Sequence, residues 1–194
     1  MAVNLQKGQR VTLDNTMKLA LVGLGWQTNQ YDGVDFDLDA SAFLLGSNGK
    51  CSRDEDFIFY GNLTSRNNAI VHQGDEIKGG DGNSDDEQII IDFTKIPSEV
   101  DKIAVCVSIY DSEKNLQNFG QVSNAYIRVA KLANEFDTVG EDQLRFDLAE
   151  EFSIETALVI CEIYRHNGEW KFNAVAQGFQ GGLAAIVRNY GLQC

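Results

Sequence analysis

The chain has 194 residues, 43% of them hydrophobic, and a formal net charge of −13. A chain of this length and apolar content buries one sizeable core, so the sequence predicts a single domain over residues 1–194. The excess of carboxylates would repel phosphate backbones, and no apolar run is long enough to span a bilayer or form a secretory signal. We therefore expect a cytoplasmic protein that does not bind nucleic acid.

Short β-branched or aromatic runs follow one another along the chain and predict strands, because they are too short and too alternating for helices. Polar Gly, Asn and Asp clusters separate them, and Asn48-Gly49 and Asn167-Gly168 suit tight hairpins. Many short strands at regular spacing indicate a sandwich or a barrel. In chain order the runs are LALVGLGW (19–26), SAFLL (41–45), DFIFY (56–60), QIIIDF (88–93), KIAVCVSIY (102–110), AYIRVA (125–130), LRFDL (144–148), ALVICEIY (157–164) and WKFNAVAQG (170–178).

One stretch near the C-terminus, GGLAAIVRNYG at 181–191, has helical spacing of its apolar residues and glycines at both ends. The sequence therefore predicts an all-β fold with a short C-terminal helix that flanks the sheets. The cysteines have neither zinc nor redox spacing, and Cys106 and Cys161 lie within apolar runs. We expect these two to be buried free thiols.

Two acidic segments carry nine of the thirteen net negative charges. Residues 32–41 read DGVDFDLDAS, in which Asp35, Asp37 and Asp39 alternate with apolar residues, so that on a strand the three carboxylates would share one face. Residues 74–87 read GDEIKGGDGNSDDE, with six acids and four glycines. Two carboxylates about 4 Å apart repel by roughly 4 kcal/mol at an effective dielectric constant near 20, so such groups need a cation or ample solvent between them.

The donors in these segments are hard oxygens without sulfur or histidine, which favours calcium over magnesium. An EF-hand is excluded: in a loop counted from Asp81, Asp86 stands at the sixth position, where glycine is required, and a strand follows. The sequence therefore predicts calcium held by loops of the β-fold. The alternative interpretation is a solvated acidic loop that only aids solubility.

Several segments resemble the TerD family of tellurium-resistance and stress-response proteins: VGLGW, DGVDFDLDASAFLL, DDEQI, NFGQVSNAYIRV and ETALVICEIYRHNGEWKFNAVAQGFQGGL. The resemblance runs nearly end to end. It implies a β-sandwich that binds calcium in acidic loops. We therefore expect a β-sandwich of two mainly antiparallel sheets and, because both acidic clusters are rich in hard oxygen donors, more than one calcium ion. Tyr110 stands where the family has histidine, and Glu76 where it has asparagine. The residues that the resemblance and the loop pattern together nominate as metal ligands are Asp35, Asp37, Asp39, Asp75, Asp81, Asp85, Asp86, Glu87 and Asp111.

Two functions remain open. The first is a non-catalytic, calcium-dependent binding or scaffold module of a stress system. Its expected partners are other stress-system proteins, with the inner face of the membrane as a candidate location, and no small-molecule substrate. The second is a divalent-metal-dependent hydrolase that uses the same carboxylates. The sequence favours the first, because the acidic clusters contain no general base other than further acids. His72 and His166 are the only histidines, and neither lies near a serine or cysteine motif of known type.

Overall fold

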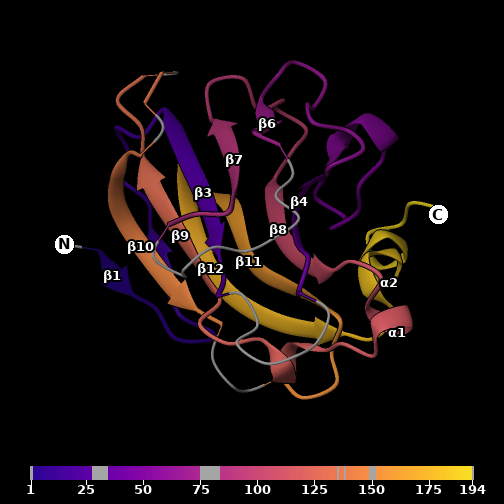
Figure 1. Cartoon of the computed structure of the whole chain (residues 1–194). Coiled ribbons are helices and arrows are strands. Elements are labelled where there is room, and N and C mark those ends of the chain that lie inside the picture. The colour runs from indigo at the N-terminus through magenta and orange to yellow at the C-terminus, as the bar shows by residue number, and fades with distance from the viewer. Residues whose placement is uncertain are drawn as a thin grey trace.

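The computed structural model describes residues 2–27, 35–74, 84–134, 136–137, 139–148 and 152–193. Within these residues the chain forms two sheets of six strands, stacked as a sandwich (Figure 1). Sheet A has the order β1 (Val3–Asn4), β10 (Glu141–Asp147), β9 (Tyr126–Lys131), β3 (Leu19–Gly25), β7 (Glu87–Asp92), β6 (Ile70–His72). Sheet B has the order β2 (Arg10–Thr12), β12 (Glu169–Phe179), β11 (Ala157–His166), β8 (Lys102–Ile109), β4 (Leu38–Leu45), β5 (Phe57–Ile58).

The strand pairings are antiparallel except that of β1 with β10. The predicted mainly antiparallel sandwich is thereby confirmed, and the barrel alternative is not needed. The helical elements are short: η1 (Asp54–Asp56), α1 (Ser112–Asn115), η2 (Phe119–Gln121) and the predicted C-terminal helix α2 (Gly182–Asn189).

The main core lies between the sheets, where alternate residues of each strand point inward. On β4 these are Leu38, Ala40, Ala42 and Leu44, and they meet the inward side chains of β3 and β7. Cys161 lies in this core and is free, as predicted.

A second apolar cluster covers the outer face of sheet B. Helix α2 places Ile186, Val187 and Tyr190 against Phe43 of β4 and Cys106 of β8. This explains why the run IAVCVSI is buried continuously instead of alternating: one face packs on sheet A and the other on α2. Figure 1 shows α2 and α1 together at the same side of the sandwich, where the C-terminus also lies.

Candidate functional site

The two acidic segments meet where sheet A reaches the edge of β4. Strand β5 pairs with Ala42 and Phe43, and among the described residues no strand pairs with β4 on that side at Ala40. Side chains of sheet A take that place: Ala40 N–H donates to Glu87 Oε2 at 2.6 Å, and His72 Nε2 lies 3.2 Å from Ala40 O. Gly74 N–H donates to His72 Nδ1 at 3.2 Å, so the ring proton is on Nε2 and is donated to the Ala40 carbonyl. The side chains of Glu87 and His72 thus make the hydrogen bonds to the Ala40 backbone that a neighbouring strand would otherwise make.

Trp26 ties both acidic segments to the end of β3. Its backbone N–H donates to Asp86 Oδ2 at 2.8 Å, and its indole Nε1 donates to Phe36 O at 3.1 Å. Asp86 N–H in turn donates to Leu24 O at 2.8 Å. The indole is fully buried, and its hydrogen bond to Phe36 O fixes the position of the chain before β4 relative to the end of β3.

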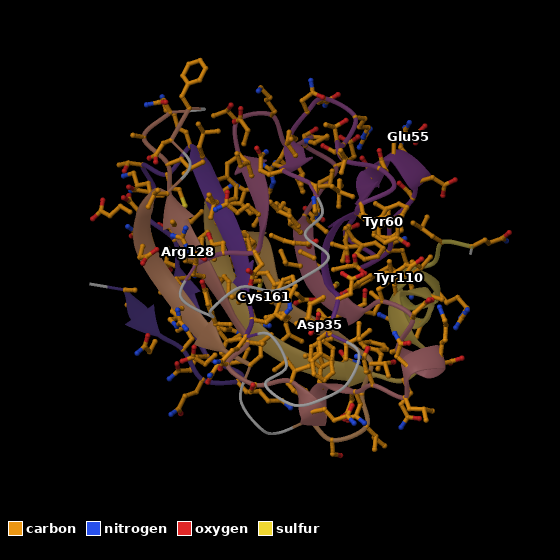
Figure 2. All side chains as sticks on the ribbon, in the orientation of Figure 1. Asp35, Glu55, Tyr60, Tyr110, Arg128 and Cys161 are labelled. Carbon is orange, nitrogen blue, oxygen red and sulfur yellow. The ribbon has the colours of Figure 1, made fainter. Side chains whose placement is uncertain are left out.

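Asp85 faces the outer side of sheet A, away from the Ala40 junction. Arg128 Nε donates to its two carboxylate oxygens at 2.8 and 3.0 Å, and Arg128 Nη2 donates to Oδ2 at 2.6 Å. Gln88 Nε2 and Tyr126 Oη lie 2.9 and 3.3 Å from the same carboxylate. The hydrogen bonds from Arg128 to Asp85 raise the pKa of Arg128. Burial raises the pKa of Tyr126 to about 12, and the negative charge of Asp85 acts in the same direction. Figure 2 labels Arg128 on the strand side of the molecule opposite α2.

The structure explains the two glycines of the VGLGW motif, Gly23 and Gly25. A Cβ atom on Gly23 would lie 2.3 Å from the Asp85 carboxyl group, and one on Gly25 would lie 2.6 Å from the Tyr126 ring. Both distances are far below van der Waals contact. Gly23 therefore leaves the space that the Asp85 carboxyl occupies beside Arg128, and Gly25 leaves the space that the Tyr126 ring occupies.

Three other predicted ligands, Asp37, Asp39 and Asp111, gather at the end of β8. Tyr110 N–H donates to Asp37 O at 2.9 Å, and Asp39 is paired in register with Ser108. Asp39 is only 4% exposed, and together with Asp111 it lines a cavity of about 580 Å³. Lys114 Nζ lies 2.9 Å from Asp111 Oδ2, and this contact raises the pKa of Lys114.

The alternating pattern of the first acidic segment holds only in part. Strand β4 begins at Leu38, so Asp35 and Asp37 precede the strand instead of belonging to it, whereas Phe36, Leu38 and Ala40 do point into the core. Asp35 is exposed, and its carbonyl accepts a hydrogen bond from Gln117 Nε2 at 3.2 Å. The strand pattern was wrong for these two residues, because both lie before the first residue of β4; the carbonyl of Asp37 accepts a hydrogen bond from Tyr110 N–H at 2.9 Å.

The donor chemistry fits calcium in kind, since Asp37, Asp39, Asp86 and Asp111 present hard carboxylate oxygens. Within the part of the chain that the structure describes, however, no three His, Cys, Asp or Glu side chains form a group able to hold a metal ion. Asp75 and Asp81 lie outside the described residues. Asp85 binds Arg128, and Glu87 binds the edge of β4 at Ala40. Each therefore has a structural role whether or not it contacts a metal. The ligand set stays a prediction.

Side chains suited to other chemistry are structurally engaged or exposed. His72 is buried between Ala40 and Glu87, and His166 is exposed at the end of β11. Burial raises the pKa of Cys51 to about 11 and raises those of Cys106 and Cys161, so these thiols stay protonated and are poor nucleophiles. No helix in the described ranges is long and apolar enough to cross a membrane.

Comparisons with known proteins agree with the fold. The model of the TerD domain matches residues 1–190. The chain is 51% identical to the tellurium resistance protein TerD of Serratia marcescens, over 99% of this chain and 98% of that protein. It is 49% identical to general stress protein 16U of Bacillus subtilis, over 100% and 99%. A solved homologue of telluride resistance protein (TerD) from Streptomyces coelicolor superposes with a TM-score of 0.68 at 19% identity, covering 86% of this chain and 93% of that one, which bears on the fold alone.

Proposed function

The chain belongs to the TerD family of tellurium-resistance and stress-response proteins, and from this premise we propose that it is a calcium-binding module that presents a surface to other stress-system proteins. The observation that carries the proposal is the meeting of the two acidic segments, joined by the hydrogen bond from Ala40 N–H to Glu87 Oε2. Bringing net negative charge together without a counter-ion opposes folding, and a bound cation would remove that penalty.

The hydrogen bonds of His72 favour a scaffold role over metal-dependent hydrolysis. A general base must reach the water that the metal activates. His72 instead donates to Ala40 O and accepts from Gly74 N–H, so both ring nitrogens are occupied by the backbone. Turnover assays on phosphate esters with magnesium, manganese and calcium test this choice: metal-dependent hydrolysis that is lost in an Asp37→Asn/Asp39→Asn variant would favour the enzyme.

Calorimetry tests calcium binding directly. We expect more than one site and tighter binding of calcium than of magnesium. The variant Asp37→Asn/Asp39→Asn should bind calcium more weakly, whereas Glu141→Gln/Glu169→Gln removes the same charge at two exposed positions and should bind normally. An absence of calcium heat, or equal affinity for both ions, would contradict the proposal. Equal calcium binding by the two double variants would show that Asp37 and Asp39 are not ligands.

Thermal unfolding gives an independent test. Calcium at about a hundred times its Kd should stabilise the native state by roughly 2.7 kcal/mol, which for a chain of this length raises Tm by roughly 5–10 °C. Chelator should reverse the rise, and moderate sodium chloride should not reproduce it. If sodium chloride alone gives the same rise, general screening relieves the acidic segments and the solubility interpretation is correct.

Partner binding and location are part of the same proposal. Pull-down from stressed cells, with and without chelator, should recover stress-system proteins only when calcium is present. Fractionation of the same cells tests the predicted cytoplasmic location and attachment to the inner face of the membrane. Recovery of the same proteins in chelator would separate partner binding from calcium.

A further inference from the structure

A glutamine outside the predicted ligand set lies beside the first acidic segment. Gln117 follows helix α1, and its side-chain Nε2 donates to Asp35 O at 3.2 Å. Its backbone N–H donates to Ser112 O at 2.9 Å, and the N–H of the next residue, Asn118, donates to Gln121 Oε1 at 2.9 Å. Hydrogen bonds therefore hold both the backbone and the side-chain amide of Gln117 in place. Asp35, whose carbonyl accepts from this amide, is labelled in Figure 2.

The amide oxygen of Gln117 is a buried acceptor to which no described residue donates. The residue is 7% exposed, and its Oε1 accepts no hydrogen bond within the part of the chain that the structure describes. The same holds for Oδ1 of Asp37, a buried carboxylate oxygen two residues after Asp35. Both side chains make other interactions, so only these two oxygen atoms are at issue. Buried polar atoms are almost always paired, and a charged one is the costliest to leave unpaired, so these oxygens require a cation or a donor.

The turn from residue 110 to residue 117 contacts the first acidic segment at two points. At one end Tyr110 N–H donates to Asp37 O at 2.9 Å, and at the other end Gln117 Nε2 donates to Asp35 O. Asp111, a predicted ligand, follows Tyr110 directly. These hydrogen bonds fix the Gln117 amide relative to Asp37, and such preorganised donors are what a metal site needs.

We propose that Gln117 is a calcium ligand and that its Oε1 binds the same ion as Asp37 Oδ1. Calcium accepts amide oxygens together with carboxylates, whereas magnesium keeps several of its waters. A site completed by an amide oxygen needs fewer acidic side chains, in keeping with the absence of a group of three His, Cys, Asp or Glu side chains from the described ranges. Gln117 is a ligand only if the chain binds calcium, so this proposal rests on the proposed function.

Two substitutions separate a ligand from a residue that only positions Asp35. Gln117→Met and Gln117→Glu both remove the Nε2–H donor to Asp35 O, and both keep a side chain of similar length. Only glutamate keeps an oxygen that a metal ion binds. A positioning role therefore predicts equal effects of the two substitutions on calcium binding, whereas a ligand role predicts different effects.

Calorimetry on the full chain measures the difference. Gln117→Met should weaken calcium binding at one site by about tenfold or more, since even residues that only orient metal ligands contribute 10–100-fold. Gln117→Glu should retain the affinity for calcium. The matched control, Gln177→Met, makes the first change at an exposed position of β12 and should bind calcium normally. Equal weakening by Gln117→Met and Gln117→Glu overturns the proposal, and so does normal binding by Gln117→Met.

Nuclear magnetic resonance of the unmodified chain gives a second test that does not depend on the folding of a variant. The side-chain carbonyl carbon of Gln117 should shift as calcium is added and should stop shifting when its site is saturated. A resonance that stays in place while calcorimetric binding is complete overturns the proposal.

Failure of this proposal and failure of the proposed function give different results. If calcium binds to the unmodified chain and equally well to Gln117→Met, Gln117 is not a ligand and the proposed function stands. If the unmodified chain gives no calcium heat, the proposed function is wrong and the assignment of Gln117 is wrong with it.

Discussion

Replacement of Asp85 by asparagine tests whether this predicted ligand is mainly a structural residue. The Asp85 side chain is 2% exposed and that of Arg128 is 14% exposed, so their ion pair is largely removed from water. Arg128, Gln88 and Tyr126 all direct hydrogen-bond donors at the two carboxylate oxygens. Asparagine has the same shape but offers one oxygen and places an amide N–H₂ group among these donors.

The expected cost follows from the burial of the pair. Removing one partner of a buried ion pair costs about 3–5 kcal/mol, because the remaining charge is left without compensation. Arg128 keeps its contacts to Asp142 and to the carbonyl of Val139, so we expect about 3 kcal/mol, or a fall in Tm of roughly 6–12 °C. The Asp142 side chain is 52% exposed, and Asp142→Asn should therefore cost less than about 1 kcal/mol.

The assay is urea unfolding at pH 7 in chelator and in calcium, with Arg128→Met and the double variant Asp85→Asn/Arg128→Met included. In chelator the two single changes should cost more together than the double variant does, which is the signature of a direct pair. The reasoning is refuted if Asp85→Asn is as stable as the unmodified protein in chelator and loses only the stabilisation that calcium gives. That result would make Asp85 a metal ligand and not the partner of Arg128.

Three further outcomes are expected. Gly23→Ala should destabilise the protein by at least as much as Asp85→Asn, measured by urea unfolding, because its Cβ would occupy the position of the Asp85 carboxyl; a neutral effect would show that the carboxyl can move freely. Glu87→Ala should cost roughly 1–3 kcal/mol and speed hydrogen exchange at the Ala40 amide, which loses its acceptor; unchanged exchange would contradict this. The pKa of Tyr126 is about 12 in the folded state against 10 in a free tyrosine, so the folded state retains a proton that the unfolded state loses, and stability should fall as pH rises from about 10 to about 12. Tyr126→Phe should remove roughly 2–3 kcal/mol of that fall, and an identical pH profile in the variant would show that Tyr126 is not its source.

The sequence alone determined the class of fold. Alternating β-branched runs, hairpin dipeptides and one amphipathic stretch with flanking glycines report local periodicity, and each depends on neighbours that are close in the chain. The all-β class, the helix Gly182–Asn189 and the buried cysteines followed from such patterns and are confirmed. These patterns left a sandwich and a barrel open, and the resemblance to the TerD family implied the sandwich that the structure shows. The concentration of charge in residues 32–41 and 74–87 was also visible in the sequence.

Only the tertiary structure decided what the individual carboxylates contact. In sequence, Asp85, Asp86 and Glu87 are equivalent members of one acidic run. In the structure, Asp85 binds Arg128, Asp86 binds the Trp26 amide, and Glu87 binds the edge of β4. Local sequence patterns cannot predict these contacts or the space above Gly23, because each contact is between residues more than forty positions apart. The side on which a carboxylate emerges, and the donor it meets there, is fixed by how the two sheets pack and where the strands end.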